Sequence, residues 1–216
     1  MPEMVPGVPR SELRDDLVDV ELISSDTVYR GHVWNIDQDR FRLGDDEIVR
    51  EYMAHTGAVA ILAIDDDDRV LLIKQYRHPI RTREWELPAG LLDITGEPAL
   101  AAAQRELAEE ADLVAGRWDL LSEFATSAGG SNEMIRVFLA RDVSAAPEVF
   151  ARTEEEAGIE VRWVPLDELI EAVLARQVQN SILVIAALSA AAARSRGWST
   201  LGAADAPWLR HPLERG

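Results

Sequence analysis

A continuous apolar run, GAVAILAI, occupies residues 57–64 and constrains the fold more than any other part of the chain. A short apolar run bounded by turn residues is typical of a central strand that is covered on both faces. Four consecutive aspartates at 65–68 predict a solvated turn, and RVLLIKQYR at 69–77 predicts a partner strand, so we expect a hairpin. A calcium loop is a weaker interpretation of the aspartates, because consecutive side chains lack the ligand spacing of such loops.

Residue patterns on either side of this run divide the chain into four segments. Residues 1–16 are rich in proline and charge, which predicts a flexible arm. Residues 17–55 alternate like strands between turn signals but hold few large aliphatic side chains, so we expect a small antiparallel β region that leans on another part. Residues 56–197 carry the main domain, and residues 198–216, which include two prolines, predict an irregular tail.

The main domain mixes strand and helix patterns, which predicts an α/β (α+β) fold. Strands are expected at 85–90, 118–126, 134–141 and 160–165, and helices at 98–110, 166–177 and 181–197. Pro98 suits the first turn of its helix, because its φ is preset and it has no amide hydrogen to lose. Gly197 is expected to end the last helix.

The composition excludes several classes of function. Lys and Arg number 22 against 39 Asp and Glu, so the net charge is −17, and an acidic surface repels the phosphates of nucleic acids. The chain has no cysteine, which excludes disulfides, cysteine zinc sites and thiol nucleophiles and fits a cytoplasmic location. The N-terminus has no signal-peptide core, and the apolar run at 181–193 is too short and alanine-rich for a membrane span, so no membrane partner is expected.

A concentration of carboxylates marks the helix predicted at 98–110. Glu106 is followed by Glu109 at i+3 and by Glu110 at i+4, and these spacings place the three side chains on one helix face. Like charges there repel, so a bound cation is one explanation of the pattern. Oxygen ligands favour Mg²⁺, with Mn²⁺ as a substitute. The alternative is a solvated acidic face, and the bare pattern by itself favours that alternative.

The residues around these glutamates change that balance. From Gly90 the chain reads GLLDITGEPALAAAQRELAEEADL, which resembles the Nudix hydrolase signature: a glycine, a glutamate, seven residues, Arg-Glu and a Glu-Glu pair. There are two departures from the pattern. The interval from Gly90 to Glu97 is one residue longer than usual, and Asp112 stands where a glycine is usual, although Asp tolerates a left-handed helix end better than most residues.

The resemblance implies a Nudix-type α/β/α sandwich with a mixed sheet, and a metal site on the carboxylate helix. Glu106 and Glu110 would be the principal metal ligands, Glu109 would assist through the metal or a water molecule, and Ala89 would offer its backbone carbonyl.

Three further signature residues would support that site. Arg105 would orient the glutamates through charge-assisted hydrogen bonds. Glu97, near the helix start, would anchor the preceding loop, and Gly90 would permit the turn.

The same resemblance implies hydrolysis of a diphosphate, and features outside the signature are similar to the branch of the family that acts on ADP-ribose. In that branch the general base lies on a later loop, which matches TEEEAG at 153–158 here. Glu155 is the best match for the base, with Glu154 and Glu156 as alternatives. The other interpretation is an acidic surface loop without a catalytic role. Glu109 and Arg105 would complete the catalytic set.

Residues implied to contact the substrate are scattered along the chain: Arg77 in QYRHP, Glu84 before ELPAG, Arg50, Glu133, and an aromatic ring, Trp34 or Tyr29, that would stack on adenine across a dimer. Packing is the alternative for either aromatic ring, and solvation is the alternative for Arg50. Structural roles are expected for the four histidines. A proline usual in the ADP-ribose branch is replaced by Ala128, which would free that loop and weakens the substrate assignment.

The resulting hypothesis is a homodimeric, cytoplasmic, Mg²⁺-dependent Nudix hydrolase that converts ADP-ribose to AMP and ribose 5-phosphate. The N-terminal β region would form the dimer. The first alternative is another nucleoside diphosphate sugar, such as GDP-mannose, or a dinucleotide. An alternative of another class is a non-catalytic nucleotide-binding module, although such modules often lose signature glutamates and all are present here.

Overall fold

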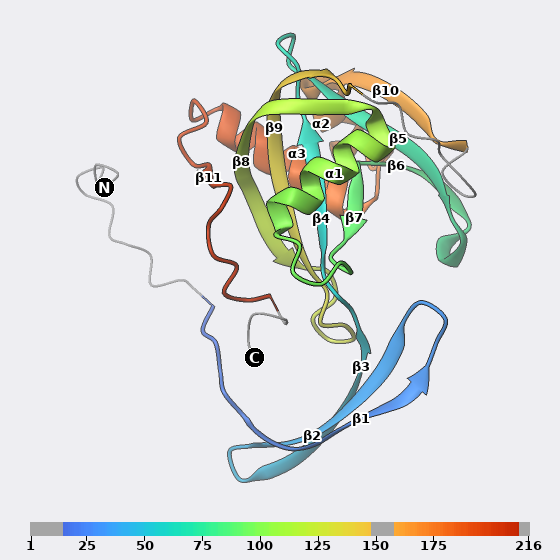
Figure 1. Ribbon diagram of the computed structural model, residues 1–216, viewed down its shortest axis with the longest axis vertical. Helices are drawn as coiled ribbons and strands as arrows, with labels where there is room; N and C mark the ends of the chain where they lie inside the picture. Colours follow the sequence, from blue (N-terminus) through green and yellow to red (C-terminus); the bar gives the residue numbers. More distant parts are fainter. Residues whose placement is uncertain (1–14, 148–157, 212–216) are drawn as a thin grey trace, which may run out of the picture.

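The computed structural model describes residues 15–147 and 158–211, which form a small N-terminal sheet and a larger body (Figure 1). The N-terminal sheet is antiparallel, in the order β1-β2-β3, and consists of β1 (Glu21–Arg30), β2 (Asn35–Leu43) and β3 (Asp46–Ala54). The three strands expected between residues 17 and 55 are confirmed. β3 leads directly into the body through a short link at residues 55–57.

The body follows the expected alternation of strands and helices. Its elements are β4 (Ala58–Ala63), β5 (Arg69–Arg77), the 3-10 turn η1 (His78–Ile80), β6 (Thr82–Glu86), β7 (Ala89–Leu91), α1 (Ala99–Ala111), β8 (Leu113–Ala125), β9 (Met134–Ala145), β10 (Glu160–Pro165), α2 (Leu166–Leu174), α3 (Ser181–Arg194) and β11 (Gly202–Ala203).

Two sheets make up the middle of the body. One has five strands in the order β11-β8-β9-β4-β7, with β4 and β9 parallel and the other pairs antiparallel. The other is antiparallel, in the order β10-β5-β6.

The expected hairpin of β4 and β5 is wrong. These strands belong to different sheets and share only the isolated bridge Ile64–Val70. Both edges of β4 are taken, by β9 on one side and by β7 on the other, so β5 pairs elsewhere. The Asp65 side chain accepts hydrogen bonds from the amides of Asp67 (3.0 Å) and Arg69 (2.9 Å), which closes the turn where the chain leaves the first sheet.

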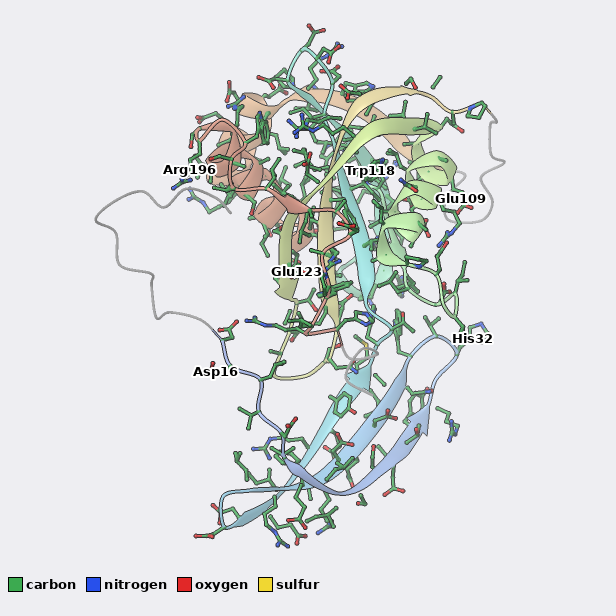
Figure 2. The ribbon with its side chains drawn as sticks, turned by 60° about the vertical axis from the view of Figure 1, so that its left-hand side comes forward. Asp16, His32, Glu109, Trp118, Glu123 and Arg196 are labelled. Carbon is green, nitrogen blue, oxygen red and sulfur yellow. The ribbon has the colours of Figure 1, made fainter. Side chains whose placement is uncertain are left out.

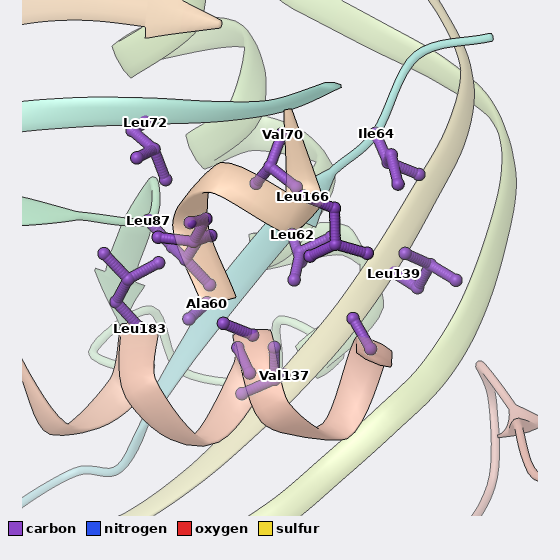
Figure 3. Close-up of a cluster of buried hydrophobic side chains, with 14 of the residues drawn as sticks. Ala60, Leu62, Ile64, Val70, Leu72, Leu87, Val137, Leu139, Leu166 and Leu183 are labelled. Carbon is purple, nitrogen blue, oxygen red and sulfur yellow. The ribbon is translucent and has the colours of Figure 1, made fainter. Parts of the chain in front are cut away.

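Side chains of β4 alternate between two apolar clusters, one on each side of the sheet. Leu62 lies in the cluster formed with α2 and α3 (Figure 3), and Ile61 lies in the cluster formed with α1. Both are fully buried. The apolar run is therefore a central strand covered on both faces, and the α/β/α sandwich is confirmed.

The ends of the helices follow the sequence with small shifts. α1 ends at Asp112, which adopts the left-handed conformation (φ 54°) that a glycine usually supplies. Pro98 is the N-cap of α1 rather than a first-turn residue. α3 ends at Arg194, and Gly197 lies in the turn that follows, with φ 60°. None of the helices in the described ranges is long and apolar enough to cross a bilayer.

The segment after α3 is mostly turns, but it packs closely on the body. β11 pairs with β8 through Gly202 and Leu120, and beyond it the side chains of Trp208 and His211 are buried. Figure 1 shows this segment running down beside β8 toward the junction with the N-terminal sheet.

Leu62→Ala is expected to lower the free energy of unfolding by about 2–5 kcal/mol, because it removes buried methyl groups and leaves a cavity between β4 and the α2–α3 layer. Chemical denaturation followed by circular dichroism measures the change. Leu174→Ala, on an exposed site of α2, is the control and is expected to change stability by less than about 0.5 kcal/mol. Equal losses in both variants would contradict the placement of Leu62 in the core.

Candidate active site

The acidic face of α1 is held against β7 by the packing of its apolar face. Ala103 and Leu107, at i and i+4, are buried in the cluster that contains Ile61 of β4. β7 pairs with the same strand, with Ala89 opposite Ala60. Helix and strand are therefore both positioned by β4, and their separation is set by the core.

Glu106 and Glu110 converge on two consecutive residues of β7. An oxygen of the Glu110 carboxylate accepts a hydrogen bond of 2.8 Å from the backbone N–H of Ala89. The carboxylate of Glu106 lies so close to Gly90 that any Cβ at that position would overlap it. Gly90 is therefore required here for close approach. The two carboxylates, one helical turn apart, meet the backbone at the position that the signature predicted for a metal.

Arg105 connects three glutamates of this face. Its Nε and Nη2 atoms each donate a hydrogen bond of 3.0 Å to Glu97, and its Nη1 donates to Glu106 (2.6 Å) and to Glu109 (3.1 Å). The hydrogen bonds from Arg105 lower the pKa of Glu97 below its usual value, and those from Glu97 raise the pKa of Arg105 further above its ordinary range. One cation therefore offsets the repulsion among these carboxylates and ties the loop end to the helix.

Glu109 differs from its two neighbours in exposure. Its side chain is 39% exposed, against 13% for Glu106, and Figure 2 shows it on the outer side of α1. An assisting contact through water fits this position better than a central one.

The donor set fits a small divalent cation. Within the described residues, no group of three or more His, Cys, Asp or Glu side chains is arranged to hold a metal. Mg²⁺ is usually bound through one or two carboxylates together with water and substrate phosphates, rather than in a cage built from protein alone. The pair Glu106 and Glu110 beside the backbone of β7 meets that requirement.

The expected phosphate contact, Arg77, is held by a residue that the sequence analysis missed. Its guanidinium donates two hydrogen bonds, of 2.8 and 2.6 Å, to the carboxylate of Glu86, which is buried. Gln75 also donates to Glu86, at 3.3 Å. The sequence contains an indication of this pairing, because Glu86 is a charged residue inside the apolar segment WELP, where a buried carboxylate needs a partner.

Strand pairing shows which side of the β5–β6 sheet these residues face. Gln75 lies opposite Glu84, and Arg77 lies opposite Thr82, so alternation puts them on the same face as Leu71. Leu71 packs in the α1 cluster. Arg77 and Glu84 therefore lie on the face of this sheet that is turned toward α1. Glu84 also accepts a long hydrogen bond of 3.5 Å from the side chain of Asn180.

Glu133 is held in the loop between β8 and β9. The hydroxyl of Thr126 donates to one of its carboxylate oxygens, and the other lies 3.2 Å from Nε2 of His55. Next to Ala128, which replaces the proline, the amides of Gly130 and Ser131 both donate to the carbonyl of Ser127. The expectation that this substitution frees the loop stays a prediction.

His55 has a structural role, as expected for the histidines, but its partners were not predicted from the sequence. Its Nδ1 accepts a hydrogen bond of 2.9 Å from the amide of Gly57, so the ring proton lies on Nε2, which faces Glu133. Burial lowers the pKa of His55, although Glu133 opposes the shift. The ring of Trp34 stacks on the imidazole with centroids 4.2 Å apart. His55 thus links the N-terminal sheet to the β8–β9 loop.

Some of the proposed substrate residues do not lie with the metal residues in this chain. Arg50 is on the exposed N-terminal sheet and donates to the carbonyl of Val49. Tyr29 is on the same sheet and is also exposed. Glu154, Glu155 and Glu156 lie outside the described residues. Gly158, which follows them, accepts a hydrogen bond of 3.1 Å from Arg83 of β6.

Gly90→Ala is expected to weaken Mn²⁺ binding by about tenfold to a hundredfold, because the new methyl group must displace the Glu106 carboxylate. Mn²⁺ titration followed by electron paramagnetic resonance measures the affinity. Gly129→Ala is the matched control, because a Cβ there meets no atom within 4 Å and φ is not in the left-handed region. Unchanged Mn²⁺ affinity in a folded Gly90→Ala protein would show that Gly90 and Glu106 are not part of the metal site.

Comparison with known proteins identifies the family of this chain. The model of the NUDIX domain matches residues 54–187. The chain is 39% identical to the ADP-ribose pyrophosphatase of Mycobacterium tuberculosis, over 90% of this chain and 93% of that protein. It is 30% identical to the methanol dehydrogenase activator of Bacillus methanolicus, over 79% and 91% of the two chains. A crystal structure of an ADP compounds hydrolase has the same fold, with a TM-score of 0.69 at 20% identity over 85% of this chain and 99% of that one. The chain therefore belongs to the Nudix hydrolase family.

Proposed function

We propose that this Nudix hydrolase cleaves the diphosphate bond of ADP-ribose, giving AMP and ribose 5-phosphate, with Mg²⁺ as its cofactor and Mn²⁺ as a substitute. The observation that carries the proposal is the pair Glu106 and Glu110, fixed by the Ala89 amide, by Gly90 and by Arg105. Two relatives, from Mycobacterium tuberculosis and Bacillus subtilis, are ADP-ribose pyrophosphatases, and they support the choice of substrate.

Nudix hydrolases generally need divalent metal ions. Here Glu106 and Glu110 would hold the metal together with the backbone carbonyl of Ala89, and Glu109 would assist. When bound, the metal would neutralise phosphate charge and lower the pKa of a water molecule. Arg105 would keep Glu106 aimed at that position through its 2.6 Å hydrogen bond.

Residues of the β5–β6 sheet and of the β8–β9 loop would bind the substrate. Arg77 presents a positive charge whose direction is set by the two hydrogen bonds to Glu86, so it would contact a phosphate without losing its orientation. Glu84 and Glu133 would contact the ribose parts or ordered water.

The reaction itself requires one proton acceptor. We propose Glu155 for this role, with Glu154 and Glu156 as alternatives. The carboxylate would take a proton from the water that attacks one phosphorus, the new P–O bond would form, and the bridging P–O bond would break. Water thereby supplies an oxygen to one phosphate, and the former bridge oxygen leaves with the other product. No protein nucleophile is required, which fits a chain without cysteine.

The N-terminal sheet supports the further proposal of a homodimer. Its strands and the segment before them expose many large apolar side chains: Leu17, Val18, Val20, Leu22, Ile23, Val28, Tyr29, Val33, Leu43 and Val49. Patches of this kind mark interaction surfaces. In a dimer, Arg50 and the Trp34 or Tyr29 ring would reach the nucleotide of the partner. The cytoplasm stays the proposed location.

Glu106→Gln and Glu110→Gln are each expected to lower turnover of ADP-ribose more than about a hundredfold, since loss of an outer-shell partner of a metal already costs up to about that factor. Chromatography of AMP and ribose 5-phosphate at saturating Mg²⁺ measures turnover. Glu171→Gln, an exposed substitution on α2, is the control. Near-normal turnover in both signature variants would remove them from the metal site.

A panel of GDP-mannose, NADH and diadenosine polyphosphates beside ADP-ribose separates the remaining alternatives. Preferred release of AMP from ADP-ribose supports the proposal. Preference for another compound keeps the metal site and replaces the substrate. Binding without turnover of any compound would favour the non-catalytic module.

A further inference from the structure

The segment that follows β11 is anchored to the body by Arg136 of β9. Nη1 of this buried side chain donates a hydrogen bond of 2.8 Å to the carbonyl of Ala206, and the guanidinium lies over the ring of Trp208, 4.7 Å from its centroid. Glu123 of β8, labelled in Figure 2, supplies the counter-charge. A buried arginine that is paired, hydrogen-bonded and stacked fixes the segment it contacts.

This anchor places His211 on the link between the N-terminal sheet and β4. The buried imidazole stacks obliquely on Trp208, and its Nε2 lies 3.0 Å from the carbonyl oxygen of Thr56. Because a carbonyl only accepts hydrogen bonds, Nε2 carries the proton in this contact. At Gly57 φ is 82°, and any Cβ there would overlap the imidazole of His211. Glycine suits this position because it tolerates a left-handed φ and has no Cβ.

The same link holds the loop that carries the metal-site backbone. The carbonyl of Gly57 accepts a hydrogen bond of 3.1 Å from the amide of Leu92, the first residue after β7 and the second after Gly90. A cavity of about 590 Å³ is lined by loop residues 92–99 together with Thr56, Trp208 and His211. The cavity therefore separates the His211 imidazole from most of this loop. The hydrogen bonds that connect His211 to the loop run through Thr56 and Gly57.

We propose that His211 is a positioning residue for the metal site. His211 donates to the carbonyl of Thr56 and packs against Gly57, so it fixes the direction of the Gly57 carbonyl. That carbonyl holds the amide of Leu92 and thereby the end of β7 beside Glu106. This inference rests on the proposed function in that the β7 backbone serves a metal. The position of the loop, however, is a property of the chain that can be measured without metal or substrate.

The first measurement is hydrogen exchange of the Leu92 amide in the metal-free protein. In His211→Ala this amide is expected to exchange at least about tenfold faster, because its acceptor is no longer held. His211→Gln should restore much of the protection, since the Gln amide can donate to the Thr56 carbonyl. Leu209→Ala, at an exposed site of the same segment, is the control. Protection of Leu92 that is equal in His211→Ala and in the control would overturn the proposal.

The second measurement is affinity for Mn²⁺, followed by electron paramagnetic resonance without substrate. His211→Ala should bind Mn²⁺ several-fold more weakly than Leu209→Ala, and His211→Gln should lie between them. A lowered Tm with unchanged Leu92 exchange and unchanged Mn²⁺ affinity would show a purely structural histidine and would overturn the proposal.

Hydrolysis assays keep this inference separate from the proposed function. If ADP-ribose is a substrate, His211→Ala should raise the Mg²⁺ concentration needed for half-maximal rate and leave kcat at saturating Mg²⁺ largely unchanged. If ADP-ribose is not turned over by the unmodified protein, the proposed substrate fails, whereas faster Leu92 exchange and weaker Mn²⁺ binding would still support the role of His211.

Discussion

The site depends on a single guanidinium that binds three carboxylates at once. Arg105 donates to Glu97, Glu106 and Glu109. Without it these glutamates would repel one another, Glu106 and Glu109 across about one turn of helix. The planar fork of arginine suits this task, because separate N–H groups reach separate acceptors while the charge stays fixed, whereas a lysine ammonium would act as a point charge. The loop before α1 is therefore tied to the middle of the helix.

The carboxylates gain their second constraint from backbone rather than from other side chains. Glu110 is set by the Ala89 amide, and Glu106 is set by the space that Gly90 leaves open. Both positions belong to a strand paired with β4, whose side chains are completely buried or nearly so. Close-packed interiors resist displacement. The acidic face therefore takes its geometry from a fully buried strand, and of the four signature glutamates only Glu109 keeps an exposed side chain.

Local patterns in the sequence predicted the central strand and the carboxylate helix, because these depend on residue spacing. The left-handed helix end at Asp112 was expected because the family signature usually has a glycine at that position. The pairing of β4 could not be predicted from the same patterns. An apolar strand followed by a tight turn favours a hairpin, but the outcome was decided by β7 and β9, whose positions are set by tertiary packing. The partners of Glu86 and His55 were missed for a similar reason. Arg77 and Glu133 meet them only after the sheets have formed.

The contact between His211 and Thr56 joins residues that are 155 positions apart. Closing so long a loop carries an entropic cost that is recovered only when the contacts at its ends form, so such contacts belong to the late stages of folding. The hydrogen bonds of α1 are local in sequence, but a helix of 13 residues gains most of its stability from packing on the core. During synthesis the residues of the acidic helix leave the ribosome well before His211, which supports the neighbouring loop. The capacity to hold a metal in its final geometry would then mature only after residue 211 has been made, rather than when the signature residues are made.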